Sequence, residues 1–465
     1  MDAPAFALGD IALFERPVEF VTPFRFGAVT VERAHQAFVR VEIVLADGRR
    51  SIGGTAELMV PKWFDKRPHL SPEATVDELR GALALARAHY LATERRATAF
   101  GHHGACYPAH MAAATAAGLP ALAAAFGPAQ MDKAILDALL RAQGIDVFTG
   151  FSGNVMGLDA RLTPDLSADQ ITAFLAARRP LPQVALRHTV GMADPLTGPG
   201  GLAAIVEETG ARFFKLKLSG DGAADAARLA AIWQVLEQVE GARASLDANE
   251  QYADLASLRA LLAQLSSDAA LRPLFHRLLY LEQPLPRDLT LETPLDGLGA
   301  DLPLIIDEAD DSYGAFPAAR ALGYGGVSSK SCKGLYKSLL NGARARTFGG
   351  FLTGEDLTCQ AGLAVQQDTA LAAFLGLTHV ERNGHHYAPG FGAAPAAEAG
   401  RFAAAHPDFY ETTAAGPRLA IRAGKLETGG LGVPGFASAA LPDWDSLSPL
   451  WTPNAAPLNP EGVLP

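Results

Sequence analysis

The feature that most constrains the fold is a series of short apolar runs, each ending in polar residues, that alternates with helical stretches from about residue 183 onward. Strands and helices that alternate in this way build parallel sheets, because each helix carries the chain back to the same edge of the sheet. The pattern therefore predicts a parallel α/β sheet or barrel. The eight predicted strands lie in VALRHTVG, ARFFKLKLSG, RASLDANEQ, RLLYLEQPLP, LPLIIDEAD, GGVSSKSC, GGFLTGED and LTHVERNG.

Charged residues close six consecutive runs at a nearly regular spacing. Successive members of this set are 30, 35, 25, 23 and 25 residues apart. A (β/α)8 barrel of about 250 residues advances by roughly 30 residues per strand–helix unit. We therefore expect a (β/α)8 barrel whose C-terminal strand ends gather these side chains around one mouth, where active sites of this fold lie. The six residues are Lys217, Asp247, Glu282, Asp307, Lys330 and Glu355.

Side-chain alternation along the runs indicates which residues face the barrel interior. Lys215 and Lys217 are two positions apart, so both point inward and the apolar residues beside them face the helices. Asp247 and Asn249 share the inward face by the same rule. The charged residues therefore form a layer inside the predicted barrel.

Three carboxylates close three successive runs, and lysines close the runs before and after them. Like charges that are buried together repel one another unless a cation lies among them. Oxygen ligands without histidine or cysteine favour a hard ion such as Mg²⁺ over zinc. The third acid stays open at this point, because alternation in LIIDEA allows either Asp307 or Glu308 to point inward.

The chain before the barrel divides into strands and then helices. A hairpin is predicted around Asp47-Gly48, and a helix is predicted to begin after Ser71 with Pro72 as its first residue. A second helix, MDKAILDALLRAQG, is expected to end at Gly144. The uncharged stretch Met111–Gln130 contains two glycines and two prolines, which indicate a broken, buried segment and not a membrane span.

Composition narrows the classes of partner. A net charge of −11 without runs of lysine or arginine argues against binding of nucleic acid or of anionic membranes. The cysteines Cys106, Cys332 and Cys359 form no CxxC pair, which disfavours a disulfide framework or a zinc ribbon and favours a reducing compartment. The first residues lack the basic start and apolar core of a signal peptide. We therefore expect a cytoplasmic protein.

Histidines outside the predicted strand ends are weaker candidates for a site. His102, His103 and His110, in GHHGACYPAH, could form a metal cluster, but a polar loop or a substrate contact is favoured. His385 and His386 follow the eighth run and could flank the pocket, although a structural role is the more common one for such residues.

The order of the motifs resembles the enolase superfamily, and more narrowly the muconate lactonizing enzyme subgroup of the mandelate racemase/muconate lactonizing enzyme family. The motifs are KLK, LDAN, EQP, DE and a lysine after the sixth strand. The resemblance implies an N-terminal α+β capping domain over residues 1–182, a catalytic barrel over 183–395 and a C-terminal segment, 396–465, that returns to the cap. Stretches near 100–130 and 440–465 have no counterpart in the family.

The resemblance also implies a role for each residue of the motifs. Such a site holds Mg²⁺ and removes the proton next to the carboxylate of a small acid through a stabilised enolate, which leads to racemisation, epimerisation, cycloisomerisation or dehydration. The absence of a His–Asp pair on the sixth and seventh strands disfavours the mandelate racemase type of site. The implied metal ligands are Asp247, Glu282 and Asp307, the acid/base catalysts are Lys217 and Lys330, and the supporting polar groups at the substrate are Lys215, Asn249 and Glu355.

Two other functions stay in view. A Schiff-base aldolase also uses a lysine at a barrel strand end, but the three carboxylates argue against it. A barrel that binds a ligand without catalysis is disfavoured by the intact acids and both lysines. The cap is expected to contact the small carboxylate substrate around Thr22–Phe26 and Gly53–Glu57, and the family's habit implies a homo-oligomer.

Overall fold

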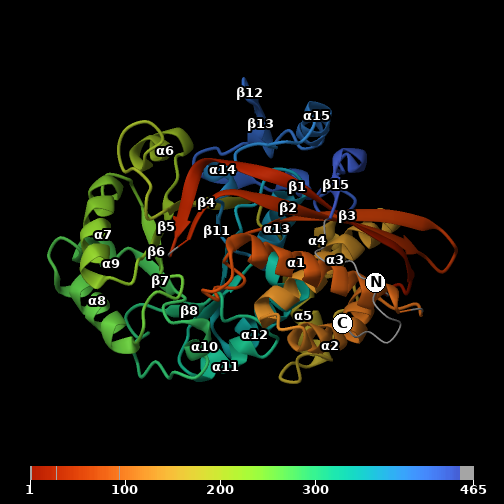
Figure 1. Ribbon diagram of the computed structural model, residues 1–465, viewed down its shortest axis with the longest axis horizontal. Helices are drawn as coiled ribbons and strands as arrows, with labels where there is room; N and C mark the ends of the chain where they lie inside the picture. The colour runs from red at the N-terminus through yellow and green to blue at the C-terminus, as the bar shows by residue number, and fades with distance from the viewer. Residues whose placement is uncertain (1–2, 28, 94, 451–465) are drawn as a thin grey trace.

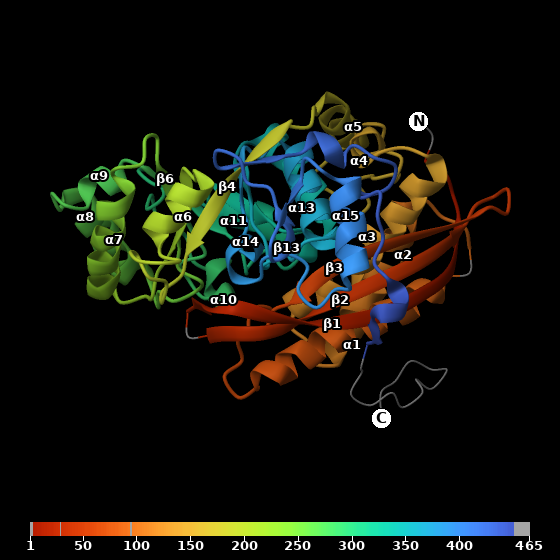
Figure 2. The same ribbon diagram turned by 90° about the horizontal axis from the view of Figure 1, so that it is seen from above.

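The computed structural model describes residues 3–450 except residues 28 and 94. An antiparallel sheet and the helices beside it form the N-terminal part, and a closed barrel forms the middle of the chain (Figure 1). Seen from above, the N-terminal sheet runs along one side of the molecule, and the barrel helices α7, α8 and α9 lie at the opposite end from α2 (Figure 2).

Eight parallel strands form the barrel, and they pair in the order in which they follow one another along the chain. The first of them also pairs with the last, through His379↔Ala185 and Glu381↔Arg187, so the sheet is closed. The predicted (β/α)8 barrel is thereby confirmed. Its strands are β4 (Gln183–Val190), β5 (Phe213–Lys217), β6 (Arg243–Asp247), β7 (Leu278–Glu282), β8 (Leu304–Ile306), β9 (Gly326–Ser329), β10 (Phe351–Gly354) and β11 (His379–Glu381).

Helices follow the barrel strands and cover them from outside. Leucine, isoleucine and alanine side chains of these helices pack against the outward-facing side chains of the strands, which buries one apolar layer around the barrel. The helices with buried side chains in this layer are α6 (Leu202–Thr209), α7 (Gly222–Leu236), α8 (Leu255–Ser267), α9 (Arg272–Phe275) and α11 (Ala315–Ala321). The helices α10 (Arg287–Thr290), α12 (Leu335–Phe348) and α13 (Leu363–Leu375) also follow barrel strands, and a 3₁₀ turn, η1 (Ser331–Lys333), follows β9. The helices α14 (Gly384–Tyr387) and α15 (Ala396–Ala405) come after the last barrel strand.

The N-terminal sheet consists of β1 (Ala7–Phe26), β2 (Val29–Val44) and β3 (Arg50–Met59), and the predicted hairpin turn at Asp47-Gly48 joins the last two. Helix α3 (Ala121–Gln143) packs on this sheet together with α1 (Pro72–Leu91). The contact is close at Gly53, where a Cβ atom would lie 2.4 Å from the carbonyl oxygen of Ala134. Glycine at this position therefore lets the helix approach the strand.

The C-terminal segment connects the barrel to the N-terminal sheet. The strand β14 (Lys425–Glu427) pairs antiparallel with β4, and β15 (Ser448–Pro449) pairs with β1. Between them, the Phe436 amide donates to Asp137 of α3 at 2.7 Å. The hairpin β12 (Tyr410–Thr413) and β13 (Gly416–Leu419) precedes this return. The domain boundaries at 182 and 395 stay predictions, and residues 451–465 of the unmatched stretch 440–465 lie outside the described residues.

The helix caps agree with the predictions from sequence, and the segment between them agrees in part. Ser71 caps α1 through its side chain, and α3 ends at Gly144 in the left-handed conformation, as expected. The expected break in the stretch 111–130 occurs at the turn around Gly118 and Pro120, but the further break expected at Gly127 and Pro128 and the polar loop expected at GHHGACYPAH were wrong. The helix α2 (Ala99–Ala116) contains all three histidines of that motif in buried positions, and α3 continues through Gly127 and Pro128.

The unbroken helix α3 has a physical explanation in its neighbours. Gly127 lies where α1 crosses, because a Cβ there would come within 2.2 Å of the Ala82 carbonyl oxygen. Pro128 has no N–H, so the Ala124 carbonyl four residues earlier loses its helical partner. His110 replaces that partner, with Nε2 2.8 Å from the Ala124 oxygen. Burial lowers the pKa of His110 to about 4, so the ring is neutral at pH 7.

We expect the substitution His110→Ala to lower the free energy of unfolding by about 1–3 kcal/mol, because it leaves the buried Ala124 carbonyl without a donor. His110→Gln, whose amide can reach a similar position, should recover part of this loss. His69→Ala, at an exposed histidine, is the control and should change little. Urea unfolding followed by circular dichroism measures all three variants. Equal stability of His110→Ala and wild type would contradict the assignment of His110.

Among the described residues, no helix is both long enough and apolar enough to cross a membrane. The uncharged stretch Met111–Gln130 covers the end of α2, a short turn and the first part of α3.

Candidate active site at the barrel mouth

The strands place their charged residues inside the barrel by simple alternation. Phe214, Leu216 and Leu218 belong to the apolar layer beneath the helices, so Lys215 and Lys217 face the interior. The same holds for β6, where Ala244, Leu246 and Ala248 face outward and Asp247 and Asn249 face inward. The predicted orientation of these two runs is confirmed.

Alternation also separates the two acids after β8. Leu304 and Ile306 lie in the outer apolar layer, so the next inward position after Ile305 is Asp307. Asp307 accepts a hydrogen bond from Lys330 Nζ at 2.7 Å. Glu308 is also fully buried, but it accepts from Asn249 Nδ2 at 3.1 Å and from Lys66 of the N-terminal part at 3.2 Å. Asp307 therefore pairs with a lysine of the barrel, whereas Glu308 contacts Asn249 and a lysine of the N-terminal part.

Lys215 lies among four buried carboxylates. Its Nζ is 2.9 Å from Asp247, 3.0 Å from Glu282, 2.7 Å from Glu355 and 3.0 Å from Glu381. Burial acts to lower the pKa of this ammonium, but the surrounding carboxylates outweigh it and hold the pKa well above its ordinary value. Lys215 is therefore a permanent positive charge at the centre of the barrel.

Lys217 lies two residues after Lys215 on β5, nearer the barrel mouth. Its Nζ donates to Asp247 Oδ2 at 2.6 Å and to Asn249 Oδ1 at 2.8 Å. The rings of Phe24 and Phe26, at the end of β1, lie with their centres 5.8 and 6.0 Å from this nitrogen. The ammonium is thus held by the barrel on one side and covered by the N-terminal sheet on the other.

Lys330 follows β9 and has a similar environment. Its Nζ donates to Asp307 and lies 4.2 Å from the ring centre of Trp63. Although burial disfavours the charged form, Asp307 raises the pKa of Lys330 above its ordinary value. A further lysine, Lys333 of η1, lies 3.1 Å from the other oxygen of Asp307.

Lys217 and Lys330 belong to opposite sides of the barrel. They close β5 and follow β9, which are four strands apart in a closed sheet of eight. The strands β6, β7 and β8 between them carry Asp247, Glu282 and Asp307 at or just after their ends. The arrangement places one ammonium group on each side of an arc of three carboxylates.

A small cavity lies between the barrel mouth and the N-terminal sheet, and both lysines line it. Its barrel side is polar and its other side is apolar. The cap was expected to contribute residues from Thr22–Phe26 and from Gly53–Glu57, and Phe24 and Phe26 of the first segment line the cavity. None of the described lining residues belongs to Gly53–Glu57, and Val60 and Trp63 line the cavity instead. Glu57 instead pairs with Lys133 of α3 at 3.0 Å. The full lining is Phe24, Phe26, Val60, Trp63, Lys215, Lys217, Asn249, Lys330, Asp356, Leu357, Thr358, Glu381 and Asn383.

The donor set at the mouth fits a hard cation by its chemistry. Burial, followed by the negative charges of Asp247 and Glu355, raises the pKa of Glu282 well above its ordinary value. A cation beside Glu282 would relieve this repulsion. Among the described residues, however, no three side chains of His, Cys, Asp or Glu are already gathered in a metal-binding arrangement. The carboxylates are paired with lysines instead.

The remaining predicted site residue, Glu355, follows β10 and faces the barrel interior. It is fully buried and accepts from Arg187 of β4 and from Lys215. Its expected contact with substrate stays a prediction. Sequence reasoning missed Glu381, which closes the eighth run in LTHVERNG as the other acids close theirs, and that signal could have identified it. Arg187 and Lys333 carried no comparable signal.

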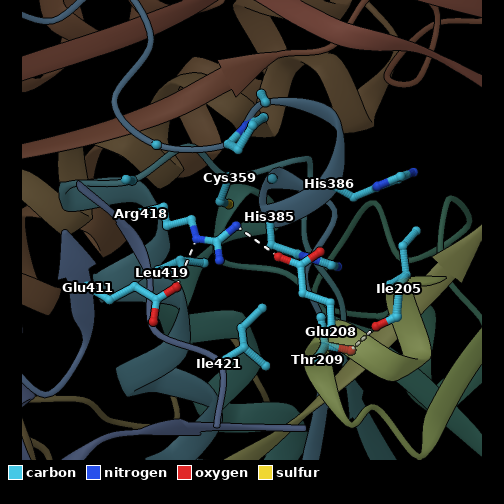
Figure 3. A pocket seen from close by; sticks show the side chains of 15 residues that line it. Ile205, Glu208, Thr209, Cys359, His385, His386, Glu411, Arg418, Leu419 and Ile421 are labelled. Atoms are coloured by element: carbon cyan, nitrogen blue, oxygen red, sulfur yellow. Dashed lines mark hydrogen bonds and ion pairs between the residues drawn. The ribbon is translucent and has the colours of Figure 1, made fainter. Parts of the chain in front are cut away.

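A second, larger pocket lies beside α14. His385 and His386 line this pocket and not the one between the two lysines (Figure 3). Arg418 reaches across it and pairs with Glu411 at 2.8 Å and Glu208 at 3.0 Å. The hypothesis that the two histidines flank the lysine cavity receives no support from this placement.

Comparison with known proteins supports the motif-based resemblance at the level of the fold. No family profile and no curated protein sequence matches this chain. Solved structures match over nearly the whole chain: a mandelate racemase/muconate lactonizing protein from Herpetosiphon aurantiacus is 18% identical, with 94% of this chain and 99% of the other chain covered and a TM-score of 0.61. A muconate lactonizing enzyme from Mycobacterium smegmatis, complexed with muconolactone, is 17% identical, with 94% of this chain and 98% of the other covered and a TM-score of 0.63. A dipeptide epimerase from Enterococcus faecalis, complexed with Mg and L-Leu-L-Tyr, is 13% identical, with 93% of this chain and 99% of the other covered and a TM-score of 0.60. The chain therefore has the barrel-and-cap fold of these enzymes.

Proposed function

We propose that this protein is a Mg²⁺-dependent enzyme that removes a proton next to the carboxylate of a small acid. The observation that carries this proposal is the placement of Lys217 and Lys330 on opposite sides of one cavity, with three buried carboxylates on the strands between them. The fold shared with racemases, epimerases and muconate lactonizing enzymes supports the same reaction type. Within that type, isomerisation or elimination is the expected class.

Asp247, Glu282 and Asp307 would hold the metal ion. When bound, Mg²⁺ would supply positive charge to the substrate carboxylate and so stabilise the negative charge that develops there. The proposed ligands are all completely buried, which keeps water from weakening this interaction. Lys66, which contacts Glu308 and the Asn249 carbonyl, fastens the N-terminal part to the same edge of the barrel.

The two lysines would transfer the proton. A small carboxylate in the cavity would present one face of its α-carbon to Lys217 and the opposite face to Lys330. One amine removes the proton and the other ammonium delivers it, or assists the departure of a leaving group. Delivery to the opposite face inverts the α-carbon, whereas loss of a β-substituent or closure of a ring gives a lyase or a cycloisomerase.

The cavity walls indicate the shape of the substrate. The barrel side offers charged and amide groups, and the side formed by Phe24, Phe26, Val60 and Trp63 is apolar. A substrate that fits both walls carries its carboxylate toward the barrel and an apolar group toward the cap. We therefore place apolar or aromatic carboxylic acids first among the candidates.

Metal binding tests this proposal without knowledge of the substrate. We expect isothermal titration of chelator-treated protein to show one Mg²⁺ bound per chain, with no binding after Glu282→Gln. Borohydride treatment in the presence of candidate carbonyl compounds should leave the protein mass unchanged, because the proposed reaction transfers protons and forms no covalent bond between a lysine and the substrate. Absence of Mg²⁺ binding together with a trapped adduct would instead support the aldolase function.

A further inference from the structure

The inference concerns Lys215, whose four carboxylate partners fall into two pairs. Asp247 and Glu282 belong to the proposed metal ligands, and their oxygens lie 2.9 and 3.0 Å from Nζ. Glu355 and Glu381 lie outside the proposed ligand set, and their Oε2 atoms lie 2.7 and 3.0 Å from the same nitrogen. A metal ion held by the first pair and the ammonium of Lys215 would therefore compete for the same oxygens.

The second pair is built to receive an ammonium group. Glu355 uses Oε1 to accept from Arg187, from Tyr280 at 3.2 Å and from Thr353 at 2.9 Å. Glu381 likewise uses Oε1 to accept from Thr189 at 2.6 Å and from Asn383 at 2.8 Å. Both carboxylates are thereby fixed by neighbours other than Lys215, and both turn Oε2 toward it.

The first pair depends on Lys215 unequally. Asp247 also accepts from Lys217, and Glu282 has no other lysine or arginine within ion-pair distance among the described residues. An ammonium has three N–H groups, so four carboxylates compete for three hydrogen bonds. The flexible four-carbon stem of lysine allows Nζ to withdraw from the first pair and stay on the second while β5 stays in place.

We propose that Lys215 is an internal counter-cation shared by all four carboxylates before the metal is loaded, and that it withdraws from Asp247 and Glu282 and stays on Glu355 and Glu381 when Mg²⁺ binds. The inference rests on the proposed function and adds to it a step in metal loading. Four buried carboxylates without a cation would repel one another strongly. Lys215 supplies that charge before loading, and Glu355 and Glu381 keep it within the barrel afterwards. These two glutamates are therefore positioning residues for Lys215.

The substitution Lys215→Met tests the competition, because it removes the charge and keeps much of the side-chain volume. We expect the variant to bind Mg²⁺ or Mn²⁺ at least tenfold more tightly than wild type by isothermal titration. Its melting temperature should fall without metal and rise more than that of wild type when metal is added. Lys217→Met is the matched control, because it removes an ammonium that contacts Asp247 but not Glu282. Its metal affinity should rise less.

Crystals of the wild-type protein with Mn²⁺ test the movement directly and do not depend on the stability of a variant. We expect Nζ of Lys215 to leave Glu282 and to remain within hydrogen-bonding distance of Glu355 and Glu381. A bound ion with Nζ still on Glu282, or equal affinities of Lys215→Met and wild type, would overturn this inference and leave the metal site standing. Absence of metal from both wild type and Lys215→Met would overturn the inference and the proposed function together.

Discussion

Lys217→Ala is expected to lose α-proton exchange in D₂O with one enantiomer of a racemised substrate, and Lys330→Ala with the other. Each loss should be about 10²–10⁴-fold, the usual contribution of a positioned acid or base. The reason is the separation of the two lysines by four strands of the closed barrel, which gives each of them one face of the α-carbon. Proton NMR of the separate enantiomers measures the exchange rates.

The control for this experiment removes an equivalent charge that does not line the cavity. Lys333 contacts Asp307 as Lys330 does, but it is absent from the described lining residues. Lys333→Ala should therefore affect both enantiomers to the same degree. Wild-type exchange of both enantiomers by Lys217→Ala or Lys330→Ala, with metal binding intact, would exclude that lysine as an acid/base. If the reaction is an elimination or a ring closure, the corresponding measurement is loss of turnover.

Removal of a metal ligand is expected to have the second large effect. Asp307→Asn and Glu282→Gln should weaken Mg²⁺ binding by more than the roughly 10–100-fold that loss of an outer-shell partner costs. Glu308→Gln is the matched comparison, because Glu308 is the adjacent acid, is equally buried and contacts Lys66 and Asn249. It should weaken binding much less. Titration with Mg²⁺ and circular dichroism distinguish loss of affinity from loss of folding.

The opposite order of these effects would reassign the third ligand. If Glu308→Gln abolished binding while Asp307→Asn retained it, the metal would lie on the side of Lys66, and Asp307 would serve only to hold Lys330 and Lys333. The same result would show that the inward position after Ile305 is not the one that binds the metal. The proposed role of Glu282 would be unaffected by that outcome.

The barrel could be predicted from the sequence because its information is periodic. Charged strand ends such as Lys217 and Asp247 recur at a spacing that only a strand–helix repeat explains, and alternation fixes the side on which Lys215 lies. The hairpin turn and the ends of the first and third helices follow from local turn and capping chemistry. These features depend on few neighbours, and for that reason the sequence alone reveals them.

The features that the sequence did not reveal depend on contacts between distant segments. Gly127 and Pro128 predicted a broken segment, but the close approach of α1 and the hydrogen bond from His110 make a continuous helix possible. Trp63 of the N-terminal part contacts Lys330, which lies far away in the sequence. The position of Lys215 among four acids likewise depends on how strands β5, β6, β7, β10 and β11 come together in the closed barrel.

The most direct test of the central claim is the exchange of α-protons in a panel of small carboxylic acids in D₂O. We expect at least one acid with an apolar side group to gain deuterium at its α-carbon when wild-type protein and Mg²⁺ are present. Exchange should stop after chelation and return when Mg²⁺ is added. Undiminished exchange in chelator-treated protein, or a substrate turned over without any loss of α-hydrogen, would contradict the account.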